Sequence, residues 1–193
     1  MGQTVVVFFG MTASGKSHLS TAWARRHHCA RFNTDVVRKR DIARPGERED
    51  GGRGIHQGIY TAAYSRRTYR RLLELAAQAL ARSACHCVVL DGSYQLLTLR
   101  KQLIARFARR CQVYFIYCHC SEAVTRRRLA ERRDDVTAVS DGDIEVYRYQ
   151  CRQFEQPVEI DSRHLLVLDT DAPLEYLIDR LEAFLVGAGA RLW

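Results

Sequence analysis

A glycine-rich stretch near the start of the chain has the residue types and the spacing of a phosphate-binding loop. Gly10-Met11-Thr12-Ala13-Ser14-Gly15-Lys16-Ser17 matches the pattern G-x-x-x-x-G-K-[ST] at every position. The glycines let backbone N–H groups turn toward phosphate oxygens, and the N-terminus of a following helix adds partial positive charge. Lys16 would reach the β- and γ-phosphates, while the Ser17 hydroxyl would bind Mg²⁺. The residues expected to hold the nucleotide are Gly10, Ala13, Ser14, Gly15, Lys16, Ser17 and His18.

Two apolar segments that end in an aspartate are candidates for holding the magnesium ion. Val88-Val89-Leu90-Asp91 is an apolar run followed by a carboxylate, an arrangement that holds Mg²⁺, usually through water. Residues 165–169 have the same form and end in Asp169, which is the alternative. We favour Ser17 and Asp91 as the metal ligands, because the third strand is expected beside the strand that leads into the phosphate-binding loop. Asp169 is expected in a turn or at a helix N-terminus near the adenine.

A third aspartate, Asp35, follows the second expected strand and could act as a general base. Parallel sheets bind ligands at the carboxyl ends of their strands, where this carboxylate could accept the proton of an attacking hydroxyl. Arg38, one helical turn further on, would share its face and could hold an anionic or hydroxyl-rich acceptor. The alternative role of Asp35 is the N-cap of a helix over 36–43, and both roles could hold together.

Arginines crowd the segment that follows the fourth expected strand. An arginine-rich lid can close over a phosphoryl group during transfer, neutralise its charge and exclude water. Arg128 and Arg132 are four residues apart and would project from one face of a helix, which makes them the candidate catalytic arginines. The alternative is a solvated basic face. The cluster comprises Arg126, Arg127, Arg128, Arg132 and Arg133.

Strands that alternate with helices position these residues. Such alternation predicts a parallel sheet with right-handed crossovers. We therefore expect one domain over residues 1–193, a three-layer α/β sandwich with a five-stranded parallel sheet, a helical lid inserted at about 121–160 and a flexible loop at 46–58. The expected strands are Thr4 to Phe9, Cys29 to Asn33, His86 to Leu90, Val113 to Cys118 and Leu165 to Leu168. The expected helices are Lys16 to Arg26, Val36 to Ala43, Tyr60 to Arg82, Leu96 to Arg110, Ala123 to Arg133, Ile144 to Phe154 and Leu174 to Leu185.

Charge and cysteine content narrow the classes of partner and compartment. The net charge is +8 and the pI is near 9.3, which favours anionic partners such as nucleotides or nucleic acid. Seven cysteines, an odd number, fit reduced thiols better than a disulfide framework. Two Cys-His-Cys triplets, at 85–87 and 118–120, have the wrong spacing for a zinc knuckle and are expected at opposite ends of the sheet. No apolar run is long enough to span a membrane, so we expect a cytoplasmic protein.

The order of these motifs resembles a known family. The phosphate-binding loop, Thr34-Asp35-Val36-Val37-Arg38-Lys39, Leu90-Asp91, residues 120–132, Gln153-Phe154-Glu155 and Leu168-Asp169-Thr170 resemble bacterial AAA-type P-loop kinase-like ATP-binding proteins. That family belongs to the P-loop NTPases and is similar to the kinase domain of polynucleotide 5′-kinases and, more loosely, to zeta-toxin, gluconate and chloramphenicol kinases. The resemblance implies ATP and Mg²⁺ as cofactors, Lys16 and Ser17 at the phosphates, Asp35 as base, Arg38 on the acceptor, and Arg128 and Arg132 in the lid.

Two classes of function compete. The first is a phosphotransferase that moves the γ-phosphoryl group of Mg·ATP to a hydroxyl of a small molecule or to a nucleic-acid 5′-OH. Asp35 and Arg38 favour it, because a pure ATP switch needs no acceptor base. The second is an ATP-binding, slowly hydrolysing interaction module without a phosphoacceptor. A basic nucleic-acid binder without nucleotide chemistry is disfavoured, because it would make the phosphate-binding loop accidental.

Overall fold

Five parallel strands form one sheet at the centre of the molecule. The computed structural model describes residues 2–43, 61–82, 85–133 and 143–190. The strand order is β2-β3-β1-β4-β5, so β1 lies in the middle and pairs with both β3 and β4. The five-stranded parallel sheet predicted from the sequence is confirmed. The strands are β1 (Gln3–Phe9), β2 (Ala30–Asn33), β3 (Cys87–Gly92), β4 (Cys111–His119) and β5 (Leu165–Asp169).

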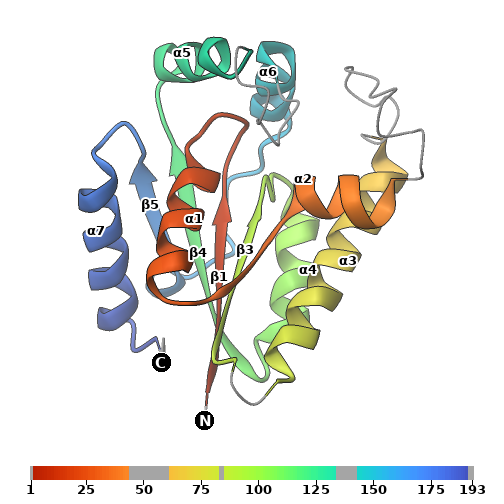
Figure 1. The fold of residues 1–193 in the computed structure, drawn as a ribbon, viewed down its shortest axis with the longest axis vertical. Helices are drawn as coiled ribbons and strands as arrows, with labels where there is room; N and C mark the ends of the chain where they lie inside the picture. Colours follow the sequence, from red (N-terminus) through yellow and green to blue (C-terminus); the bar gives the residue numbers. More distant parts are fainter. Residues whose placement is uncertain (1, 44–60, 83–84, 134–142, 191–193) are drawn as a thin grey trace.

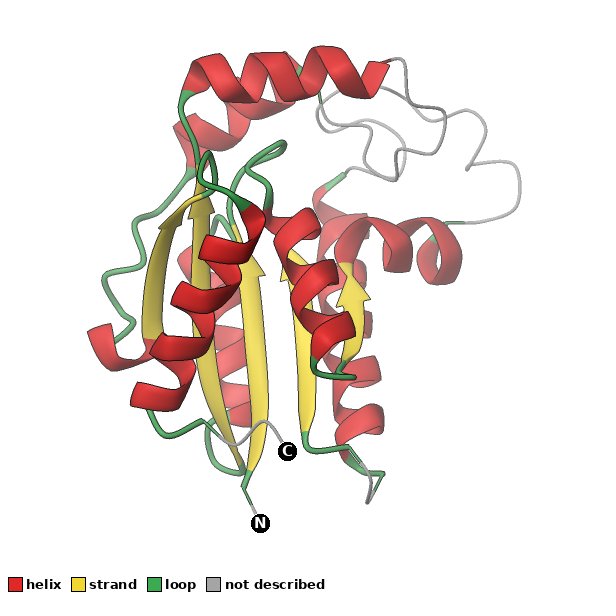
Figure 2. Ribbon diagram, turned by 60° about the vertical axis from the view of Figure 1, so that its left-hand side comes forward, coloured by secondary structure: helices red, strands yellow, loops and turns green. Residues whose placement is uncertain are grey.

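Helices cover both faces of the sheet and complete the three layers (Figures 1 and 2). Helices α1 and α7 lie on one face, whereas α3 and α4 lie on the other. The longer helices are α1 (Lys16–Arg26), α3 (Ala62–Leu80), α4 (Leu97–Phe107), α5 (Glu122–Arg133), α6 (Ile144–Gln153) and α7 (Leu174–Gly187). The shorter turns are α2 (Thr34–Val37), the π-helix η1 (Arg38–Ile42) and the 3₁₀ turn η3 (Ser162–His164). None of the helices in the described part of the chain is long and apolar enough to cross a membrane.

Strand β1 supplies side chains to both hydrophobic cores. Val5, Val7 and Phe9 pack with the core under α3 and α4, whereas Val6 and Phe8 pack with the core under α1 and α7. All five are fully buried, which explains why this strand is apolar at every position instead of alternating. Burial of each such side chain stabilises the fold by about 1.5–3 kcal/mol. The buried side chains of β1 therefore fix the position of its carboxyl end, where the phosphate-binding loop begins.

The segment after β2 differs from the prediction. A helix over 36–43 was expected, but the α-helix begins at Thr34 and gives way to a π-helical turn at Arg38. The Asn33 side chain caps it, since its oxygen accepts the N–H groups of Asp35 at 2.9 Å and Val36 at 3.1 Å. The alternative role of Asp35 as an N-cap is therefore wrong. Its carboxylate lies in the first helical turn and is left for other contacts.

Helices α5 and α6 lie across the carboxyl ends of the strands (Figure 1). They fall within the segment 121–160 that was expected to form a lid. The chain after α6 is anchored by Arg100, a fully buried side chain that binds Glu159 and donates to the carbonyl of Tyr94 at 2.9 Å. Phe154 stacks on Tyr117 with ring centroids 5.1 Å apart. The expected loop at 46–58 and residues 134–142 of the lid lie outside the described residues.

Candidate active site

The phosphate-binding loop leaves β1 in a conformation that its small residues permit. Gly10 and Gly15 have φ values of 144° and 79°, both in the region that favours glycine. A Cβ atom on Gly10 would lie 2.1 Å from the Cys118 carbonyl oxygen of β4, so no larger residue fits there. Ala13 also has a positive φ, 58°, which costs about 1 kcal/mol in an L-residue with a Cβ. The fold therefore maintains a strained loop that leads into the N-terminus of α1, where the first N–H groups of the helix can bind phosphate oxygens.

Lys16, the first residue of α1, extends its side chain back over this loop. Its ammonium donates to the Met11 carbonyl at 2.9 Å. Desolvation lowers the pKa of Lys16 below its ordinary value, while the nearby carboxylates of Asp91 and Asp35 oppose that shift and Arg132 adds to it. An anionic ligand beside Lys16 would relieve the cost of burying its charge. The arrangement suits the β- and γ-phosphates of a nucleotide.

Asp91 lies at the end of β3 next to the loop, in a fully buried position. It pairs in register with Phe8 of β1, so the third strand does lie beside the strand that leads into the loop. One carboxylate oxygen, Oδ2, accepts from Ser20 Oγ at 3.1 Å, from Asn33 Nδ2 at 2.9 Å and from the Arg31 guanidinium. Arg31, which reaches Asp91 from the neighbouring strand β2, was not among the site residues predicted from the sequence.

Asp91 has an oxygen that could hold a magnesium ion through water. The second carboxylate oxygen of Asp91, Oδ1, is buried and has no hydrogen-bond partner among the described residues. Ser17 lies in the first turn of α1, where the nucleotide pattern places a metal-binding hydroxyl. Asp169, the alternative, is exposed, lies at the far edge of the sheet beyond β4 and accepts the Asp171 N–H at 3.1 Å. The expected turn at Asp169 is confirmed, but Pro173 precedes α7, so Asp169 is not its N-cap.

Asp35 and Arg38 form an ion pair whose carboxylate is near enough to Lys16 to affect its pKa. Arg38 Nη1 lies 2.9 Å from Asp35 Oδ1, and the two residues share one helical face as the spacing predicted. The Asp35 side chain is 23% exposed and that of Arg38 is 9% exposed, so the carboxylate faces solvent more than the guanidinium does. Asp35 could accept a proton from an incoming hydroxyl, because it is not enclosed.

Tyr69 and Ser93 form a wall beside this pair that the sequence did not indicate. The Tyr69 hydroxyl lies 3.0 Å from Ser93 Oγ and accepts the Tyr94 N–H at 3.1 Å. Burial raises the pKa of Tyr69, which is also affected by the charges of Arg38 and Asp35. A hydroxyl-bearing acceptor would meet these polar groups as well as the ion pair. The only sign in the sequence was that Ser93 and Tyr94 directly follow the strand that carries the metal candidate.

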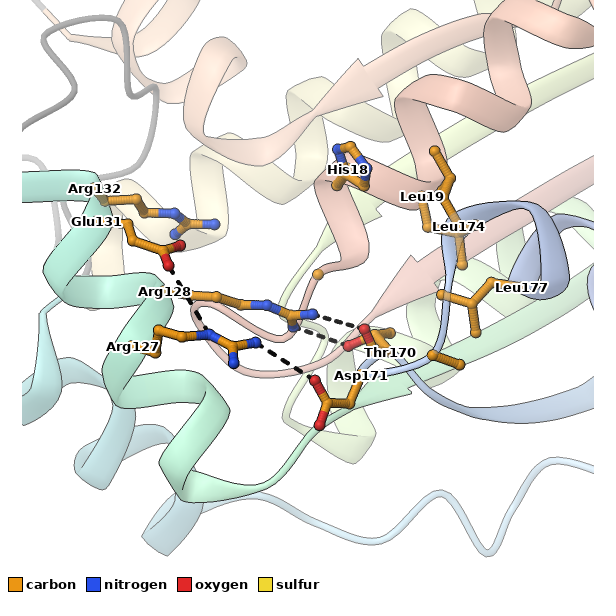
Figure 3. Close-up of a pocket in the computed structure, with 12 residues that line it drawn as sticks. His18, Leu19, Arg127, Arg128, Glu131, Arg132, Thr170, Asp171, Leu174 and Leu177 are labelled. Atoms are coloured by element: carbon orange, nitrogen blue, oxygen red, sulfur yellow. Dashed lines mark hydrogen bonds and ion pairs between the residues drawn. The ribbon is translucent and has the colours of Figure 1, made fainter.

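A pocket of about 450 Å³ opens next to the loop, between the start of α1, helix α5 and the turn after β5 (Figure 3). Arg128 reaches across it, donating to the Thr170 carbonyl at 2.6 Å and to the Thr170 hydroxyl at 3.0 Å. Arg132 and His18 also line the pocket. The two arginines thus share one helix face, as predicted, but Arg128 is held by the protein itself. The pocket adjoins Gly15 and has room for the nucleoside part of a nucleotide whose phosphates lie in the loop.

Comparisons with known proteins agree with this fold. The model of the AAA domain family matches residues 5–157. A sugar kinase from Janibacter sp. HTCC2649 has a similar structure, with 21% identity, a TM-score of 0.68 and 96% and 95% of the two chains covered. A gluconokinase from Sinorhizobium meliloti 1021 has 19% identity, a TM-score of 0.62 and coverage of 96% and 91%. A shikimate kinase from Bacteroides thetaiotaomicron has 17% identity, a TM-score of 0.60 and coverage of 94% and 98%. No curated protein matches the chain.

Proposed function

As the chain belongs to the AAA domain family, we propose that it is a kinase that transfers the γ-phosphoryl group of Mg·ATP to a hydroxyl of a small acceptor molecule. The observation that carries this proposal is the Asp35–Arg38 pair, an accessible carboxylate whose charge reaches Lys16. A protein that only bound ATP as a switch would need no such group beyond the phosphates. The fold it shares with several small-molecule kinases supports the same class of reaction.

In the proposed reaction, Asp35 accepts the proton of the acceptor hydroxyl as its oxygen attacks the γ-phosphorus. The bond from the γ-phosphorus to the bridging oxygen breaks, and ADP leaves. Lys16 and the N–H groups of the loop hold the phosphate oxygens and offset their negative charge. When bound, Mg²⁺ neutralises charge on the β- and γ-phosphates, and Ser17 together with the free oxygen of Asp91 would hold it.

We assign different roles to the two candidate arginines of the lid, Arg128 and Arg132. Arg132 lies close enough to Lys16 to lower its pKa, so we assign it to the phosphoryl group during transfer. Arg128 is bound to Thr170 and to the Ala13 carbonyl at 3.3 Å, so we assign it to the nucleoside pocket and the outer side of the loop. Residues 121–160 then act as the lid.

The acceptor is proposed to be a small polyhydroxylated compound of the sugar or sugar-acid type. Arg38 can hold a carboxylate or hydroxyls, and Tyr69 and Ser93 add polar groups beside it. A nucleic-acid 5′-OH is the competing acceptor. It would be recognised by a steep loss of binding with added salt, since phosphate contacts release counterions.

The test is transfer from γ-labelled ATP to a panel of sugars, sugar acids, cyclitols and oligonucleotides with a free 5′-OH. A labelled product that forms with one class of acceptor, and that Lys16→Met abolishes, supports the proposal and identifies the class. Slow ATP hydrolysis that no acceptor stimulates, and that Asp35→Ala leaves unchanged, would instead support the interaction module.

A further inference from the structure

The side chain of Gln150 joins helix α6 to the phosphate-binding loop. Gln150 Oε1 accepts the backbone N–H of Thr12 at 2.6 Å, across 138 positions of sequence. Thr12 is buried, with 4% of its surface exposed, whereas α6 itself has no buried residue. The bond therefore lies at a protected point of an otherwise open helix. Figure 1 shows α6 above the carboxyl end of β1, where the loop turns.

The Thr12 N–H belongs to the same peptide group as the carbonyl that holds Lys16. The Met11 carbonyl accepts from Lys16 Nζ at 2.9 Å and from the Ser14 N–H at 3.2 Å. A peptide group is planar, so its N–H and C=O directions are fixed relative to each other. Gln150 at the N–H end thus determines where the Met11 carbonyl points. A change at Gln150 would reach Lys16 through one rigid unit.

The next residue of the loop is the one that needs support. Ala13 has a φ of 58° and sits directly after the bond to Gln150. Its own carbonyl accepts from Arg128 Nη1 at 3.3 Å. Side chains from α6 and α5 thus fix the backbone on both sides of the strained position. Without them the loop could relax to a conformation that no longer directs its N–H groups inward.

We propose that Gln150 is a positioning residue of the nucleotide site, whose side-chain oxygen fixes the Met11–Thr12 peptide and through it the loop and Lys16. This inference rests on the proposed function, because it concerns the site that binds the nucleotide. One neutral hydrogen bond of this kind contributes a factor of roughly 3 to 10 in an equilibrium constant. Loss of the Gln150 oxygen should weaken nucleotide binding by that factor.

The experiment measures Mg·ADP binding by calorimetry in Gln150→Met, which keeps the side-chain length but removes the acceptor. Gln153→Met is the matched control, since Gln153 is exposed on the same helix. We expect the first variant to bind Mg·ADP about 3- to 10-fold more weakly and the second to bind like the wild type. The Thr12 amide should also exchange its hydrogen faster in Gln150→Met, which confirms that the bond is lost, and a Tm equal to that of Gln153→Met would show that the weaker binding is not a loss of stability.

Thr12→Pro removes the donor instead of the acceptor. If the two groups act through one bond, Gln150→Met should add no further loss of affinity in the Thr12→Pro background. If Thr12→Pro does not fold, the affinities of the two glutamine variants and the exchange rate of the Thr12 amide still test the role of Gln150. If Gln150→Met and Gln153→Met both bind Mg·ADP with the affinity of the wild type, the inference is overturned and the proposed function stands. No binding by the wild type would overturn both.

Discussion

Two aspartate–arginine pairs have their carboxylates near Lys16, and the two pairs differ in their surroundings. Asp91 is fully buried, and one of its oxygens receives three donors, among them the Arg31 side chain, which is 23% exposed. Asp35 is 23% exposed and, among the residues that the structure describes, forms one ion pair, with Arg38. The same two residue types thus form a closed structural cluster in one place and an accessible polar pair in the other.

The difference shows that the surroundings of a carboxylate decide its chemistry. A buried carboxylate whose charge is matched by hydrogen bonds and a guanidinium cannot receive a proton from an outside hydroxyl without breaking that cluster. Asp35 can do so, because its surface is open and its loss disturbs little packing. We therefore assign proton transfer to Asp35, and to Asp91 the joining of β2, β3 and α1 beside the metal site.

Asp91→Ala should produce the largest loss of stability. Removal of this carboxylate leaves Ser20, Asn33 and the Arg31 guanidinium without their shared acceptor, at a cost of about 3 kcal/mol. That corresponds to a fall in Tm of roughly 6–12 °C for a chain of this size. Asp169→Ala is the control, an exposed strand-end aspartate that should lower stability by less than about 0.5 kcal/mol. Equal Tm values in thermal melts would show that the Asp91 cluster is not structural.

Arg31→Met should lower stability by a smaller amount. The Asp91 charge would remain buried with only Ser20 and Asn33 as donors, which we expect to cost about 2 kcal/mol after allowing for the partial exposure of Arg31. Chemical denaturation measures this cost. Arg38→Met, the corresponding change in the open pair, should cost less, because the Asp35 carboxylate that it leaves is 23% exposed and can be hydrated; a larger loss there than in Arg31→Met would reverse the comparison.

Asp35→Ala should leave the fold nearly unchanged. The Asp35 carboxylate is partly solvated and makes one ion pair among the described residues, so the loss should be smaller than that of Asp91→Ala. The Asn33 cap of the same helix would remain in place. Urea denaturation of this variant beside Asp91→Ala gives the comparison directly. A loss of stability as large as that of Asp91→Ala would mean that Asp35 is a structural residue too.

The smallest expected effect is a pH dependence of nucleotide affinity. Desolvation lowers the pKa of Lys16 in the free protein, and bound phosphates would raise it again. Binding therefore takes up a proton at a pH above the lowered value, so affinity for Mg·ATP should fall as pH rises toward about 10. Calorimetry in buffers with different ionisation enthalpies detects that proton. Lys16→Arg stays charged throughout, so its affinity should not follow this trend; an identical trend in both proteins would rule out Lys16 as its source.

Local sequence patterns predicted the loop, the strands and their order of appearance. The glycine pattern and the apolar runs involve residues that are close together in the sequence, so they can be recognised without the structure. The partners of the catalytic candidates could not be found in this way. Arg31 and Asp91 are 60 positions apart, Gln150 and Thr12 are 138 apart, and only the packing of the sheet and the lid brings them together.

The contacts of the arginines also change what the positive net charge indicates about binding partners. The net charge of +8 favoured anionic partners, nucleic acid among them. Yet Arg31, Arg38, Arg100 and Arg128 all bind groups of the protein itself. A count of arginines therefore overstates the basic surface available to a polyanion, and it is not by itself an argument for a nucleic-acid substrate.

The most direct measurement is the rate of γ-phosphoryl transfer to the acceptor found in the panel, compared between the wild type and Asp35→Asn. This substitution keeps the shape of the side chain and removes its ability to take a proton. We predict a rate lower by about 10²- to 10⁴-fold, with Mg·ADP affinity and Tm close to those of the wild type. Transfer at the wild-type rate by Asp35→Asn would contradict the assignment of Asp35 as the base.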